Sequence, residues 1–140
     1  TVNTYVSLAS TVLAAIAGIS LLVSALMIIV TMYMSVSERT KEIGILRALG
    51  ERKKDIRRLF TSESILIGLF SAILAMVLAL ITTAILNHAL YGMIKYNIVQ
   101  ITAGNIIFAF VVAIVISFIA ALLPAHRAAN LNPIDALAAD

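Results

Sequence analysis

Three long stretches without a charged residue constrain this chain more than any other feature. Asp, Glu, Lys and Arg are absent from residues 1–37, 64–94 and 96–126. A helix crosses the hydrocarbon core of a bilayer with about 20 apolar residues, and a charge at its centre costs about 2.5 to 3.5 kcal/mol on insertion scales. Backbone groups in lipid have to bond internally, so each stretch is expected to be helical. We therefore predict membrane spans near 12–34, 65–86 and 106–123.

The composition agrees with this interpretation. Hydrophobic residues make up 62% of the chain and charged residues only 12%, whereas about a quarter of the residues of a soluble domain are charged. We predict an all-α membrane protein with three transmembrane helices, an amphipathic helix in the loop 37–63, and a short C-terminal helix. Residues 1–140 would form one domain, with a second loop at 88–105 and a tail at 124–140. The chain has no cysteine, and we expect no metal site.

Positive charge is gathered in the first loop. Eight of the ten Lys and Arg residues lie there: Arg39, Lys41, Arg47, Arg52, Lys53, Lys54, Arg57 and Arg58. Basic residues in short loops stay on the cytoplasmic side of a membrane. We therefore expect the loop 37–63 and the tail with Arg127 to be cytoplasmic, and the N-terminus and the loop 88–105, which carries only Lys95, to lie outside.

The first charge-free stretch is too long for a simple span. As one helix, residues 1–37 would reach about 55 Å at 1.5 Å per residue, well beyond a hydrocarbon core of about 30 Å. The opening TVNTYVSLAS is rich in Ser, Thr and Asn. It is expected either to rise above the outer face toward an outer domain or to be a frayed chain end.

Apolar and charged residues share one arc of a helix in the first half of the basic loop. At about 100° per residue, this arc contains Glu38, Arg39, Glu42, Ile43, Ile45, Leu46 and Leu49. Carboxylates in line with leucines suit docking onto a protein better than burial in lipid, so we predict that a partner binds this face. Gly44 costs about 1 kcal/mol relative to Ala in a helix, which indicates a close backbone approach or a tolerated defect. Gly50 is expected to end the helix.

A second helix is expected to begin in ERKKDIRRLF and to continue into the second span, with Ile56, Leu59, Phe60 and Glu63 on one face. The cations of this segment, together with Arg127 of the tail, are expected at the membrane surface, where anionic headgroups contribute about 1 kcal/mol per cation. These residues are Arg52, Lys53, Lys54, Arg57, Arg58 and Arg127.

The tail contains residues that typically end or begin a helix. Pro124 is expected to mark the end of the third span. Asn132 and Pro133 suit the N-cap and first position of a short helix. Its apolar side, with Ile134 and Leu137, would lie on the membrane or touch the same partner as the loop.

Small residues spaced four apart let membrane helices approach closely. The third span carries such a row at Ala109, Ala113, Ser117 and Ala121, and the second carries Gly68 and Ala72. We expect these rows to pack the bundle. The spans hold no Asp, Glu, Lys or Arg, so the sequence indicates no ion pathway.

Two segments, ERTKEIGILRALG and PAHRAANLNPIDAL, together with the basic helix and the three-span layout, resemble the FtsX-like permease domain of MacB-type exporters and their lipoprotein-release and cell-division relatives. The resemblance covers nearly the whole chain. The family usually has four spans with a large outer domain between the first two, so this chain is similar to the last three. Glu51 and Arg52 depart from the family pattern of a small residue followed by Ser or Thr.

The resemblance implies the transmembrane subunit of an ABC transporter in a bacterial inner membrane. Its coupling segment would be Glu38 to Gly50, acting on a partner ATPase that holds ATP and Mg²⁺. Further partners would be a second permease copy, in a homodimer or heterodimer, membrane lipid and an extracytoplasmic protein. The movement it transmits would serve efflux, lipoprotein release or transmembrane signalling.

The sequence disfavours an enzyme. It lacks the phosphate-binding G-x-x-x-x-G-K-[ST] loop and the H-E-x-x-H motif, so we assign no catalytic residue and expect no nucleic-acid partner. The alternative is a non-transporting anchor or scaffold whose basic loop only sets topology and binds anionic lipid. That alternative does not account for the apolar stripe of Ile43, Leu46 and Leu49.

Overall fold

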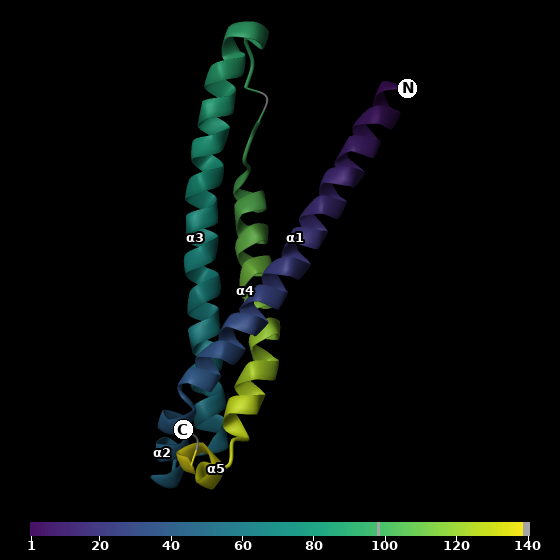
Figure 1. Ribbon diagram of the computed structural model, residues 1–140. Coiled ribbons are helices and arrows are strands. Elements are labelled where there is room, and N and C mark those ends of the chain that lie inside the picture. The colour runs from purple at the N-terminus through teal and green to yellow at the C-terminus, as the bar shows by residue number, and fades with distance from the viewer. Residues whose placement is uncertain (98, 139–140) are drawn as a thin grey trace.

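The computed structural model describes residues 1–97 and 99–138, and within them it contains α-helices and no strand (Figure 1). The helices are α1 (Val2–Glu38), α2 (Thr40–Ala48), α3 (Lys53–Ile94), α4 (Ala103–Ala129) and α5 (Pro133–Ala138). Helices α1, α3 and α4 are long and apolar enough to cross a membrane, and they contain the three spans expected from the sequence. The prediction of an all-α fold with three such helices is confirmed.

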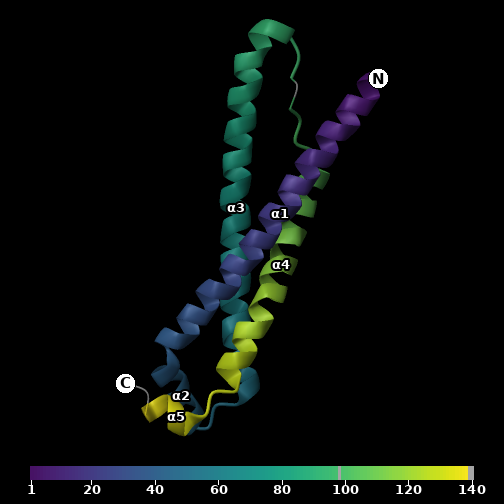
Figure 2. The same ribbon diagram turned by 45° about the vertical axis from the view of Figure 1, so that its right-hand side comes forward.

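The long helices meet at one end and separate at the other (Figures 1 and 2). Helices α3 and α4 lie side by side, while α1 crosses α4 and diverges toward its N-terminus. We call the end with α2, α5 and the adjoining turns of the long helices the basic end. The opposite end, with the N-terminal half of α1, the last turns of α3 and the first turns of α4, is the splayed end.

The hydrophobic core lies at the basic end. Its buried members come from α1 to α4 and are Met32, Val36, Ile43, Ile56, Phe60, Ala125, Ala128 and Ala129. Beyond it, every residue of α1 from Val2 to Ser24 is exposed within the chain. Lipid tails are as apolar as leucine, so the exposed apolar residues of this stretch from Val12 onward suit a helix surrounded by lipid.

Small residues bring α3 and α4 together. A side chain added at Gly68 would collide with that of Ser117 on α4. The hydroxyl of Ser64 donates a 2.8 Å hydrogen bond to the Ser117 carbonyl, and the Ser117 hydroxyl donates one to the carbonyl of Ala113. Of the row expected to pack, Ser117 and Ala121 are buried, Ala113 is half-buried, and Ala109 is exposed.

The ends of the short helices follow the local sequence. Gly50 has φ +102° just after α2. Its amide bonds to the Arg47 carbonyl at 3.2 Å, and the Glu51 amide bonds to the Leu46 carbonyl at 3.0 Å, the Schellman pattern of a glycine stop. Helix α5 begins at Pro133, as expected, and the Asn132 side chain accepts a hydrogen bond from the Ile134 amide at 3.3 Å.

Helix α4 runs past Pro124, the residue expected to mark the end of the third span. It continues to Ala129, with Pro124 buried inside it. Proline removes one i→i−4 hydrogen bond, a loss that packing can offset. Ala121, Ala125 and Ala128 around it are fully buried, so contacts with the other helices hold this segment in helical form. The opening residues are also helical, from Val2 onward.

Candidate functional site

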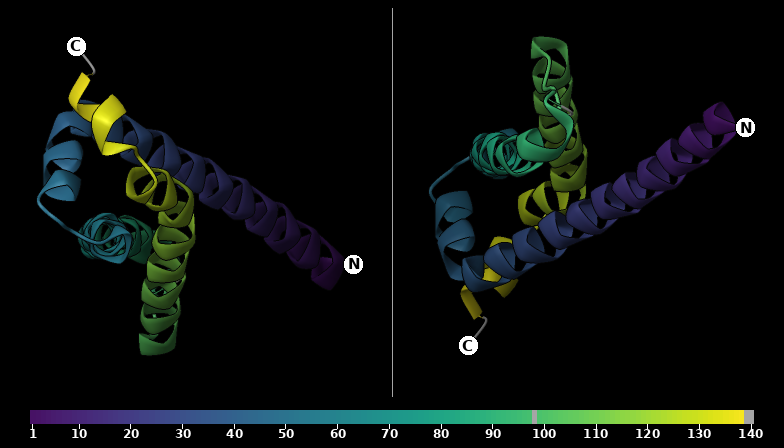
Figure 3. Two further views of the ribbon diagram at one scale, coloured as in Figure 1. Left: turned by 90° about the horizontal axis from the view of Figure 1, so that it is seen from below. Right: turned by 90° about the horizontal axis from the view of Figure 1, so that it is seen from above.

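The candidate site is the pair of short helices, α2 and α5, which lie together at the basic end (Figure 3). Helix α2 follows α1 after a break at Arg39, whose φ is −100° and ψ 16°. The Arg39 guanidinium lies 3.4 Å from the carboxylate of Glu63 on α3, with side chains 48% and 33% exposed. An ion pair this exposed contributes at most about 1 kcal/mol.

The inward side of α2 packs against the core and against α5. Ile43 is 2% exposed and belongs to the core. A Cβ added at Gly44 would lie 2.8 Å from the Cβ of Ala136 on α5, closer than carbon atoms pack. Ala136 is itself buried. The glycine therefore marks a close approach between two helices of this chain, one of the two interpretations that its position in the sequence allowed.

The outward side of α2 carries an exposed row that we call the outward stripe. It consists of Glu42, Ile45, Leu46 and Leu49. Their spacing of three and four places them along one face of the helix. Leu49 is 79% exposed, and with Ile45 at 49% and Leu46 at 36% it forms a contiguous apolar patch, the kind of surface that marks an interaction site.

The single face expected from the sequence is thus divided. Ile43 was expected beside Leu46 and Leu49, but the structure turns it inward. The physical reason is that the core formed with α1, α3 and α4 covers Ile43, while α5 packs against α2 at Gly44. Neither contact can be inferred from the periodicity of α2 itself. Glu38 is exposed at the end of α1, whereas Arg39 pairs with α3.

The basic residues expected at the membrane surface fall into two groups. Arg52, Lys54 and Arg58 are exposed. The others contact another helix: Lys53 bonds to Asn130, Arg57 contacts His126, and Arg127 lies 5.2 Å from the ring centre of Tyr33. Sequence reasoning missed these contacts because each partner lies on another helix, 69 residues away for Arg57 and 77 for Lys53.

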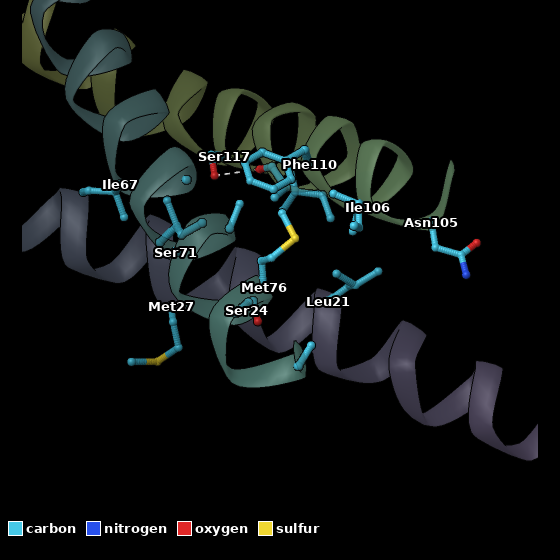
Figure 4. Close-up of a pocket in the computed structure, with 18 of the residues that line it drawn as sticks. Leu21, Ser24, Met27, Ile67, Ser71, Met76, Asn105, Ile106, Phe110 and Ser117 are labelled. Carbon is cyan, nitrogen blue, oxygen red and sulfur yellow. Dashed lines mark hydrogen bonds between the residues drawn. The ribbon is translucent and has the colours of Figure 1, made fainter. Parts of the chain in front are cut away.

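A cleft of about 620 Å³ lies between α1, α3 and α4, beyond the core (Figure 4). Met76 of α3 and Phe110 of α4 extend toward each other across it, and Asn105 lies at its edge. Apart from Asn105, its lining side chains are apolar or small, and every described one is uncharged. The hydroxyls of Ser24 and Ser117 bond to carbonyls of their own helices, so the cleft offers apolar contact.

Comparison with known protein families identifies the family of this chain. Residues 14–133 match the profile of the FtsX-like permease C-terminal family. The chain belongs to this family. The matched range of this permease domain includes all of α2 and reaches the first residue of α5. Together with the three apolar helices, membership identifies a multi-pass membrane protein.

Relatives of this permease domain include proteins of ABC transporters. An uncharacterised ABC transporter permease of Methanocaldococcus jannaschii is 36% identical, over 98% of this chain and 35% of its own. The pyoverdine export ATP-binding/permease protein PvdT of Pseudomonas putida is 37% identical, over 94% and 19%. The macrolide export ATP-binding/permease protein MacB of Agrobacterium fabrum is 35% identical, over 100% and 21%. The chain therefore spans 35% or less of the length of these relatives.

Proposed function

We propose that this domain is the permease part of a MacB-type ABC transporter and couples ATP hydrolysis by a partner ATPase to movement at the splayed end. The names of two relatives, PvdT and MacB, combine permease and ATP-binding functions and support the transporter class. The observation that carries the proposal is the outward stripe: an exposed apolar row on a helix whose opposite side is packed against the rest of the chain.

The packing of α2 suits the transmission of force. Its inward side is closely packed, because the space between Gly44 and Ala136 is too small for one more carbon atom and Ile43 is in the core. A push on the outward stripe therefore reaches α5 and the core directly. Helix α1 continues unbroken from this core to the splayed end over 37 residues, or about 55 Å at 1.5 Å per residue, so a small tilt at its base displaces its far end.

This arrangement supports three kinds of protein partner. The ATPase, which holds ATP and Mg²⁺, docks on the outward stripe, with the Glu42 carboxylate meeting a cation at the edge of its groove. A second permease copy completes the transporter, and an extracytoplasmic partner or domain takes up the movement for efflux, lipoprotein release or transmembrane signalling. The basic end faces the cytoplasm of a bacterial inner membrane and the N-terminus lies outside, because the cations are concentrated at the basic end.

The absence of cysteine allows a direct test. Single cysteines at positions 38, 42, 46 and 49 would carry a short photo-crosslinker in native membranes. We expect an ABC ATPase to be trapped, most strongly from Glu42 and Leu46. A cysteine at Ile43, which is buried, is the matched control and should trap no ATPase. Labelling of lipid alone, evenly around the helix, would contradict the proposal.

The alternative function is a non-transporting anchor whose basic loop only sets topology and binds anionic lipid. The substitution Glu42→Lys separates the two, because it adds positive charge while leaving every cation in place. The coupling proposal predicts normal insertion and loss of permease-stimulated ATP hydrolysis. The matched control Lys41→Glu, at an exposed neighbouring position, should retain most of the stimulation. Stimulation unchanged in Glu42→Lys would favour the anchor.

A further inference from the structure

Two pairs of polar side chains face each other where α3 and α4 meet at the basic end. Lys53 and Arg57 are four residues apart on α3 and share one face of it. His126 lies in the last turn of α4, and Asn130 is the residue that caps this helix. The Lys53 ammonium donates to the Asn130 side-chain oxygen at 3.2 Å, and a guanidinium nitrogen of Arg57 lies 3.3 Å from Nδ1 of His126. The Asn130 amide nitrogen lies 2.9 Å from Nε2 of His126. We call these four residues the donor cluster.

The donor cluster has more hydrogen-bond donors than acceptors. Lysine and arginine only donate, whereas a neutral histidine and an asparagine each provide one acceptor atom. Both ring nitrogens of His126 face donor groups, and a neutral imidazole accepts at only one of them. Within residues 1–97 and 99–138, the salt bridge joins Arg39 to Glu63, so no described carboxylate lies within ion-pair distance of Lys53 or Arg57. An anion with several oxygens would supply the missing acceptors.

The surface beside the cluster indicates where such an anion comes from. Ile119, Leu122 and Leu123 lie seven, four and three residues before His126 on α4 and are 59%, 43% and 62% exposed. Their spacing puts them on the face of α4 that leads into the cluster. An apolar strip that ends at a group of donors fits a phospholipid, with an acyl chain along the strip and the phosphate at the cluster. The N-terminus of α3, at Lys53, adds a favourable dipole.

We propose that the donor cluster binds the phosphate of an anionic phospholipid and so joins α3 to α4 at the membrane surface. This binding differs from the diffuse attraction that every cation of the basic end exerts on an anionic leaflet. Lys54 and Arg58 are the immediate neighbours of Lys53 and Arg57 and are also exposed. In the described part of the chain, neither takes part in a hydrogen bond to α4.

These neighbours provide matched controls of equal charge. The full chain would be purified in detergent, and retained phosphatidylglycerol measured by native mass spectrometry, with phosphatidylcholine as the zwitterionic reference. Losing a hydrogen bond to a charged group changes binding about tenfold or more. We therefore expect Arg57→Gln and Lys53→Gln to lower phosphatidylglycerol affinity about tenfold, while Arg58→Gln and Lys54→Gln change it less than about twofold. Inorganic phosphate at the same concentration should not displace the lipid.

Three results would overturn the site. Equal losses in all four variants would show diffuse attraction, equal retention of phosphatidylcholine would show no preference for an anionic lipid, and displacement by inorganic phosphate would show a site for the free ion. The thermal unfolding of each variant is measured in parallel, and Lys53→Gln decides the question if Arg57→Gln does not fold. The measurement uses no nucleotide and no ATPase, so its failure would leave the proposed coupling function untouched.

Discussion

The basic end of this domain is tightly packed, whereas the splayed end is not. At the basic end, α1 to α4 share a core with Phe60 and Met32 each 1% exposed, and α5 closes on α2. At the splayed end, every residue in the first half of α1 is exposed within the chain. Two hydrogen bonds join the Asn87 side chain of α3 to the backbone of Val99 in the connection that follows this helix. Packing is thus concentrated where the short helices have to be held, and the long helices are left free to move at the other end.

Glycine shows the same contrast at single positions. A Cβ at Gly68 or Gly44 would meet atoms of a neighbouring helix, whereas at Gly18, in the splayed part of α1, nothing lies within 4 Å. The residue type is the same, but the surroundings differ. Glycine substitutions therefore measure how tightly the packed part of the bundle and the splayed part of α1 each surround these positions.

The largest effect is expected for Gly68→Val. The new side chain would take the space of the Ser117 side chain and push α4 away from α3. Overpacking a well-packed contact costs about 1 to 3 kcal/mol, and the nearby bond from Ser64 to Ser117 would be disturbed as well, so we expect a loss near the upper limit. Unfolding by sodium dodecyl sulfate in mixed micelles measures it. Gly18→Val is the control and should change stability by less than about 0.5 kcal/mol. Equal losses would refute the contrast between the ends.

Gly44→Val should have a smaller and more local effect. Its side chain would meet Ala136 and displace α5 from α2, at a cost of about 1 to 2 kcal/mol, while the long helices stay packed. Spin labels at Lys41 and Ile134, both exposed, would report a longer and broader distance. The control Ala48→Val, at an exposed position of α2, should leave the distance unchanged. An unchanged distance in Gly44→Val would mean that α5 does not brace α2.

Removing one hydroxyl comes next. Ser64→Ala deletes the buried hydrogen bond to the Ser117 carbonyl, and we expect a loss of about 0.5 to 1.5 kcal/mol in the same unfolding titration. Thr82→Ala is the matched control, because that hydroxyl bonds to Leu78 of its own helix and is exposed. If both variants lose the same stability, the bond between α3 and α4 has no special weight.

The smallest effect is expected at the ion pair between Arg39 and Glu63. A double-mutant cycle with Arg39→Gln and Glu63→Gln should give a coupling energy below about 1 kcal/mol, and it should fall further as salt is added. The half-exposed side chains are the reason. A coupling of about 2 kcal/mol that resists salt would show that this pair, rather than the packing of Ile43 and Gly44, holds the turn between α1 and α2.

The helices and several of their ends could be predicted from the sequence. The charge-free stretches predicted three apolar helices, Gly50 predicted the end of α2, and Asn132 with Pro133 predicted the start of α5. Each of these features depends on residues that are adjacent in the chain or within one turn of a helix. The candidate site was predicted less well, since Ile43 was expected on the same face as Leu46 and Leu49 but is buried in the core, and the contacts of Lys53, Arg57 and Arg127 were not foreseen.

The sequence by itself determined that this chain has three membrane-spanning helices and a charged end. The physical reason is that charged residues are costly in lipid, so the long charge-free stretches become the spans and the clustered cations lie outside the membrane. Only the tertiary structure decided which side of α2 is free, why α4 continues through Pro124, and where α1 leaves the bundle. These outcomes depend on contacts between residues that are far apart in the chain. The periodicity of a single helix shows which residues share a face, but not which neighbour will cover it.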